Sequence, residues 1–98
     1  MSVRRPRKAL VVLAGGAADE RRAQALVDEL TAQGIQTSYA GEQSCALTIA
    51  TRAAGEQADA VEICLASGAR GVLLLRELLR ELIELGRRDI SIVVHRSR

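Results

Sequence analysis

Apolar runs recur along the chain, separated by stretches in which apolar residues keep a helical spacing. KALVVLA (8–14) is an unbroken apolar run, which is typical of a strand covered on both faces. DAVEICLA (59–66) and DISIVV (89–94) have the length and apolar content of two further strands. IQTSYA (35–40) is more polar, which indicates a strand at the edge of a sheet. The pattern therefore predicts four strands.

Three stretches between these runs have the spacing of amphipathic helices. They are DERRAQALVDELTAQG (19–34), EQSCALTIATRAAGEQA (42–58) and VLLLRELLRELIELG (72–86), and the last has the strongest pattern. Asp19 is a suitable N-cap for the first helix, and Gly34 is a suitable stop for it. Each predicted helix thus joins one predicted strand to the next.

The apolar positions also predict which face of each helix meets the sheet. In the last helix the residues of 72–75 point in all directions, so we expect part of its apolar surface to be exposed. Arg80 and Glu84 are expected to form an ion pair on its outer side. The predicted inner stripes are Ala23, Leu26, Val27 and Leu30; Ala46, Ile49, Ala50 and Ala53; and Leu75, Leu78, Leu79 and Leu82.

Strands that alternate with helices form a parallel sheet with right-handed crossovers. We expect a single domain over residues 1–98, with basic tails at 1–7 and 95–98. Sheets of this kind bind ligands at the carboxyl ends of their strands, where the strand order reverses. The candidate ligand loops are therefore 14–19 and 66–71, together with the residues after the last strand.

The composition removes several classes of function from the prediction. Tyr39 is the only aromatic residue, so the core must be aliphatic, and stacking on single-stranded nucleic acid is not expected. No apolar run reaches about 18 residues, so we expect no membrane span. The N-terminus lacks a signal-type apolar stretch, which favours a cytoplasmic location. Of the two cysteines, Cys64 is expected to be buried, whereas Cys45 lies near a helix start that would favour a thiolate.

Motifs that would indicate catalysis are absent. The chain contains no GxGxxG, GxxxxGK[ST], GxSxG or HExxH pattern, and its one histidine, His95, is far in sequence from a suitable nucleophile. SGARG (67–71) is either an ordinary helix-entry turn or an anion site in which Arg70 assists the backbone amides. An enzyme that uses Cys45 as its nucleophile is a further hypothesis.

Three segments carry a resemblance to a known family. RRPRKALVV, GEQADAVEI and ELGRRDISIVV resemble the entry strand, the approach to the third strand and the last helix and strand of a specific domain. It is the cobalamin-binding domain of methylmalonyl-CoA mutase and related acyl-CoA mutases. The resemblance implies a flavodoxin-like, three-layer α/β fold with parallel strands in the order 2-1-3-4 and helices on both faces. The family has a fifth strand, which this sequence lacks.

The resemblance also implies where a cofactor site would lie. The family's first loop carries Asp-x-His-x-x-Gly, whose histidine binds cobalt, and the matching positions here are Ala17, Asp19 and Arg22. A carboxylate is a poor ligand for the cobalt of a corrin, and Arg22 is expected to fill the space of the cofactor's nucleotide tail. His95 stands at a family glycine, either as a replacement ligand or as a partly exposed tail residue. The positions that correspond to the family site are Gly15, Gly16, Ala17, Asp19, Arg22, Ser67, Gly68 and His95, with no catalytic residue and no metal ligand among them.

These observations lead to a main expectation and an alternative. The main expectation is a non-enzymatic relative of the cobalamin-binding domain, an accessory or assembly module without a cofactor. Its partner would be another protein or a second copy, bound through the fourth-strand edge or the helix at 72–85. The alternative is a carrier or small subunit of an acyl-CoA mutase that binds cobalamin base-on, without a protein ligand to cobalt.

Overall fold

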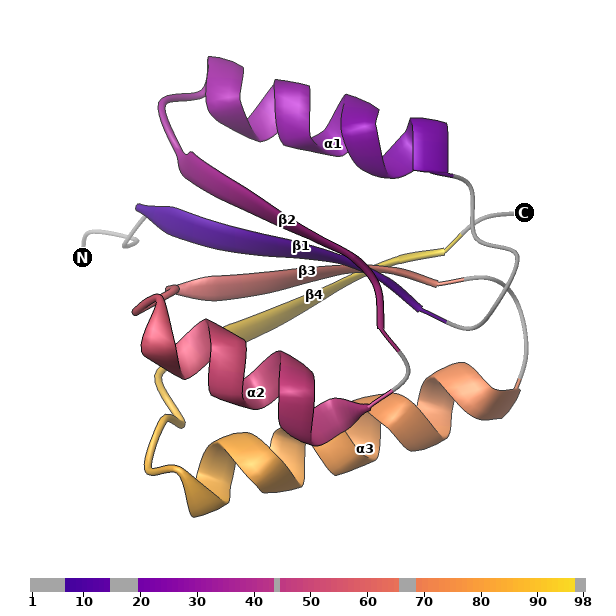
Figure 1. The fold of residues 1–98 in the computed structure, drawn as a ribbon, viewed down its shortest axis with the longest axis vertical. Helices are drawn as coiled ribbons and strands as arrows, with labels where there is room; N and C mark the ends of the chain where they lie inside the picture. Colours follow the sequence, from indigo (N-terminus) through magenta and orange to yellow (C-terminus); the bar gives the residue numbers. More distant parts are fainter. Residues whose placement is uncertain (1–6, 15–19, 44, 66–68, 97–98) are drawn as a thin grey trace, which may run out of the picture.

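The computed structural model describes residues 7–14, 20–43, 45–65 and 69–96. Strands and helices alternate along the described chain, as the apolar pattern predicts (Figure 1). The elements are β1 (Lys8–Ala14), α1 (Glu20–Ala32), β2 (Gln36–Glu42), α2 (Ala46–Gly55), β3 (Ala60–Leu65), α3 (Ala69–Glu84) and β4 (Ser91–Arg96).

All neighbouring strands of the sheet run parallel, in the order β2-β1-β3-β4. Helix α1 covers one face, while α2 and α3 lie side by side on the other (Figure 1). This confirms the predicted flavodoxin-like, three-layer α/β fold. Because three helices are divided over two faces, one face has two covering helices and the other has one.

The core consists of aliphatic side chains in two clusters, one on each face of the sheet. The larger cluster lies between the sheet and the α2–α3 layer, and it includes all four residues of the predicted inner stripe of α2. Three of those four are alanines, whose small size suits the close packing of α2 against α3. The smaller cluster lies under α1 and includes Ala23, Leu30 and, partly buried, Tyr39. β1 and β3, the two central strands, are buried almost throughout.

The ends of α1 and α2 follow from local backbone chemistry. Gly34 has φ of +82°, and the amide of Ile35 donates to the carbonyl of Leu30, so α1 ends in a left-handed cap at the predicted glycine. α2 is shorter than the predicted range 42–58. β2 continues to Glu42 before it, and Gln57 adopts φ of +57° after it, which ends the helix.

The inner stripe of α3 differs from the predicted one. Leu78 and Leu82 are buried as predicted, but Leu79 is 51% exposed, and Leu74 is buried instead. The buried row therefore follows a spacing of four residues, 74, 78 and 82, rather than including 79. The sequence does not choose between these rows, because leucines occupy positions on every side of α3. Leu75 is partly buried, as a flanking position of that row.

Both ends of the α3–β4 segment also differ from the prediction. α3 begins at Ala69, so part of the predicted turn 67–71 is helical. β4 runs to Arg96, and its register with β3 continues through Cys64 opposite His95 to Leu65 opposite Arg96. His95 and Arg96 therefore belong to a strand and not to the basic tail expected at 95–98, because β3 continues alongside them and offers a pairing partner.

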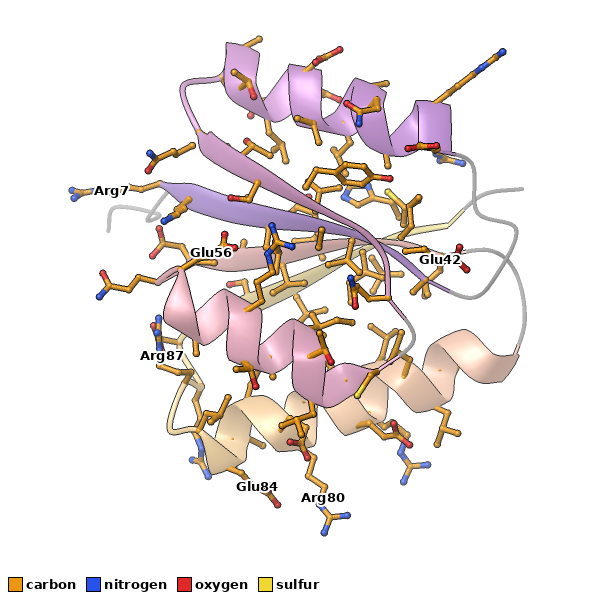
Figure 2. All side chains as sticks on the ribbon, in the orientation of Figure 1. Arg7, Glu42, Glu56, Arg80, Glu84 and Arg87 are labelled. Atoms are coloured by element: carbon orange, nitrogen blue, oxygen red, sulfur yellow. The ribbon has the colours of Figure 1, made fainter. Side chains whose placement is uncertain are left out.

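The outer side of α3 carries the predicted ion pair. Arg80 and Glu84 approach to 3.6 Å, and both side chains project away from the sheet (Figure 2). Because both are largely exposed to water, the pair contributes little to stability. The packing of Leu78 and its neighbours, and not this pair, holds α3 on the sheet.

Replacing Leu78 by Ala is expected to lower the free energy of unfolding by about 2–5 kcal/mol, because the side chain is fully buried and leaves a cavity. The matched control is Leu73→Ala on the same helix, where the side chain is 58% exposed and the expected change is within about 0.5 kcal/mol. Urea unfolding followed by circular dichroism measures both. Equal losses in the two variants would contradict the observed orientation of α3.

Candidate functional site

One half of one sheet face has no helix over it within the described chain. α1 packs over β2 and β1, so the α1 side of β3 and β4 is left partly open. Glu62 and Cys64 are two positions apart on β3, and both face this side. His95 is the register partner of Cys64 on β4. Paired residues of parallel strands share a face, so these three side chains are neighbours.

Glu62 and His95 form a hydrogen-bonded pair on this face. Nε2 of His95 lies 2.8 Å from Oε1 of Glu62. The Glu62 side chain is only 9% exposed, whereas that of His95 is 31% exposed and lies above it. A buried carboxylate is costly without a partner, so the imidazole stabilises Glu62 in this position. When Glu62 is ionised its oxygens only accept, and His95 Nε2 is then the donor.

A cleft of about 460 Å³ opens between α1 and this pair. Its wall is one side of α1, with apolar residues and the charged residues Arg22 and Glu29, and its floor is formed by β3 and β4. This volume lies within the range of small-molecule sites. The residues that line it are Arg22, Ala25, Leu26, Glu29, Leu30, Glu62, Cys64 and His95.

Cys64 lies on the floor of the cleft, but its surroundings do not activate it. Burial raises the pKa of its thiol; the positive charge of Arg22 acts in the lowering direction, and the negative charge of Glu62 raises it further. The raised pKa favours the thiol of Cys64 over the thiolate that would act as a nucleophile.

Cys45 has the opposite environment, as its position near a helix start predicts. It is the exposed N-cap residue of α2. Thr48 and the backbone of Leu47, at the start of α2, lower the pKa of its thiol, although the Cys45 side chain forms no cap hydrogen bond. The cleft beside it, about 490 Å³, is lined by the α2 start and by charged residues of α3 such as Glu77 and Arg80, without a histidine. His95 faces the other side of the sheet, so it cannot serve Cys45 as a base.

The structure brings together two of the residues singled out from the sequence. Arg22 and His95 line the same cleft, although they are 73 positions apart (95 − 22). Arg22 borders this open cleft, and its expected place in the space of a nucleotide tail stays a prediction. The other predicted site positions lie outside the described residues: Gly15, Gly16, Ala17, Asp19, Ser67 and Gly68. The anion site proposed for 67–71 also lies partly outside the described residues.

Sequence reasoning missed Glu62 as a site residue. The signal was present, because a glutamate stands in the middle of the apolar run 59–66 and a buried carboxylate needs a partner. The partner, His95, is 33 positions away and is found only when the register of β3 and β4 is known.

The described residues do not suggest a metal site or a membrane span. No three histidine, cysteine or acidic side chains among them gather closely enough to hold a metal ion. None of the helices, over the part of the chain that the structure describes, is both long and apolar enough to cross a bilayer. The chemistry of this site is therefore that of one buried acid–imidazole pair beside a partly apolar cleft.

A double-mutant cycle tests the Glu62–His95 pair. Glu62→Ala and His95→Ala are each measured alone and together at one pH, and the expected coupling free energy is about 1–2 kcal/mol, because the hydrogen bond joins a buried carboxylate to its one described partner. The same cycle on the exposed pair Arg80–Glu84 is the control, with coupling close to zero. Additive effects at Glu62 and His95 would show that the pair is not formed in solution.

The two cysteines are expected to react at very different rates. Iodoacetamide at neutral pH should modify Cys45 in the folded protein, because a lowered pKa raises its thiolate fraction, and should spare Cys64 until the chain is unfolded. Peptide mass spectrometry measures both sites in one sample. Thr48→Val should slow the reaction of Cys45, since it removes the Thr48 hydroxyl, one of the groups that lower the pKa of the thiol. Faster labelling of Cys64 than of Cys45 would contradict the described environments.

Comparisons with known proteins do not assign the chain to a family. No family model matches it, and no curated protein is significantly similar to it. The resemblance to the cobalamin-binding domain therefore depends on the three segments quoted above and agrees with the strand order observed here.

Proposed function

We propose that this chain is a relative of the cobalamin-binding domain of acyl-CoA mutases that works without catalysis, as an accessory or assembly module. The strand order 2-1-3-4 and the three resembling segments support the relationship. One observation supports the proposed loss of cobalt binding, and it concerns the histidine side chain. The one histidine of the chain is bonded to Glu62 on the α1 side of the sheet, and the family's histidine position holds Asp19.

The residues present do not fit cobalamin ligated by a histidine. Nε2 of His95 is occupied by a buried carboxylate, and releasing it would leave Glu62 without its described partner. A carboxylate at Asp19 is a poor match for corrin cobalt. A cobalt–imidazole bond is therefore not part of the proposed function.

The raised pKa of Cys64, and the absence of a histidine among the described residues that line the cleft beside Cys45, favour the non-enzymatic proposal. A thiol nucleophile needs a base or a strongly stabilised thiolate next to bound substrate. Cys45 has a lowered pKa, but its neighbours on α3 are glutamates and Arg80. An exposed thiol at a helix start does not by itself indicate an active site, because a nucleophile also needs a base or a strongly stabilised thiolate next to bound substrate.

One observation favours a second candidate, a carrier or mutase subunit that holds cobalamin base-on. The cleft beside α1 is open at Arg22, and its volume of about 460 Å³ can accept part of a ligand of that kind. In the base-on form the cofactor's own base remains on cobalt, so no protein imidazole is required. In this candidate, cobalamin would occupy the cleft, and the Glu62–His95 pair would stay in place as part of the cleft floor.

Titration with hydroxocobalamin distinguishes the two candidates. The proposed function predicts no saturable change in the cobalamin spectrum and no shift of the melting temperature. Saturable binding with a retained base-on spectrum would instead support the carrier, and a spectrum of histidine-ligated cobalamin would contradict both.

If binding is seen, two variants test whether the α1 cleft holds the cofactor. Leu26→Trp, on the cleft wall, should abolish cobalamin binding, because the larger side chain would fill the cleft. Leu47→Trp is the matched control, since Leu47 is 54% exposed on α2 and lies on the other face of the sheet. Binding that is retained by Leu26→Trp would place the cofactor elsewhere.

A further inference from the structure

The two edges of the sheet differ in how they are protected from pairing with another strand. β2, at one edge, is polar, and its register with β1 shifts between Val11 and Leu13. Gly41 in β2 has φ of +74°, and the strand ends at Glu42. Polar residues, irregular pairing and a charge are the usual devices that keep an edge strand single.

β4, at the other edge, has none of these devices over its central part. The segment 90–94 reads Ile-Ser-Ile-Val-Val, without a charge, a proline or a register shift against β3. Val93 is 38% exposed on the α1 side, and Val94 is 36% exposed on the α3 side. An apolar edge strand of this kind is a template for adding a strand.

The apolar surface continues from β4 onto α3. Leu79 and Ile83 are about half exposed on the side of α3 that faces away from α2. They form, with neighbouring residues, a groove of about 320 Å³ at the entry to β4. The residues that line this groove are Leu79, Leu82, Ile83, Arg87, Arg88 and Ile90. An occupant of the edge would therefore have to cover a strand and a helix flank together.

We propose that this edge binds a second copy of the chain, with the two β4 strands antiparallel about a two-fold axis at Val93. In antiparallel pairing, residues on the same face lie opposite each other. An axis at Val93 puts the two Val93 side chains opposite each other on one face and Ile92 opposite Val94 on the other. Apolar residues then meet apolar residues on both faces, and His95 lies opposite the uncharged Ser91.

The two-fold axis also covers α3. Strands in a sheet are about 4.8 Å apart, and α3 lies toward the β4 side of α2 (Figure 1). An axis perpendicular to the sheet places the two α3 helices on the same face, each on the β4 side of its α2. Leu79 and Ile83 of each copy would face each other across this contact.

A second copy fits the chemistry better than an unrelated strand would. The edge needs a short partner that is apolar on both faces and has no charge at its centre, and β4 itself has those properties. A self-complementary patch of this kind is typical of two-fold dimers, the commonest symmetric assembly. The inference goes beyond the proposed function, because it does not depend on whether cobalamin binds.

Sedimentation equilibrium of the full chain, without cobalamin, tests the dimer. At ~100 μM even an interface with a micromolar Kd is mostly associated, so the expected mass is twice 10.5 kDa, about 21 kDa. Val93→Lys should sediment at 10.5 kDa with an unchanged circular dichroism spectrum, and Leu47→Lys, on α2, should remain dimeric. A monomeric wild type, or a Val93→Lys variant that is still a dimer, would overturn the proposal.

A cross-link tests the position of the axis without introducing a charge. Opposed residues of an antiparallel pair are close enough for a disulfide. In a Cys45→Ser background, Val93→Cys should give a disulfide-linked dimer under mild oxidation, whereas Leu73→Cys on the outer part of α3 should not. Cross-linking through Leu73→Cys with none through Val93→Cys would place the contact on another surface. Because neither experiment contains cobalamin, failure of the dimer and failure of the proposed function are seen separately.

Discussion

The fold depends on one constraint: the three helices of the described chain have to cover the two faces of a four-stranded sheet whose central strands, β1 and β3, are buried. α2 and α3 cover one face with a closely packed layer of alanines and leucines. α1 covers only the β1–β2 half of the other. The exposed half of that face is therefore where the unusual features of the molecule are found, namely a buried glutamate, a histidine over it and an open cleft.

The features that arise from local patterns could be predicted from the sequence. Four strands, three helices, the polar edge at β2 and the alanine stripe of α2 each follow from the spacing of apolar residues. The stop of α1 at Gly34 follows from glycine's tolerance of positive φ. The strand order came from the resemblance to the family, since the spacing of apolar residues does not order parallel strands.

Features that depend on which residues meet across the sheet could not be predicted in the same way. Glu62 and His95 are on different strands, and their contact requires a register that no single segment specifies. The choice of Leu74 over Leu79 depends on the rotation of α3, which its all-round leucines leave open. The extension of β4 through His95 could not be predicted either, because the end of this strand is set by its pairing with β3. The cleft at Arg22 has the same origin, as it lies between a helix and strands distant in sequence.

Tyr39, on β2, is the one aromatic ring of the chain, and it is partly buried in the cluster under α1. Burial raises the pKa of its phenol, and the negative charges of Glu20 and Glu42 act in the same direction. The near-ultraviolet absorbance and emission of the protein therefore come from a single ring beside α1. Optical signals from this natural reporter follow events on that side, while rearrangement between α2 and α3 leaves no intrinsic chromophore to record it.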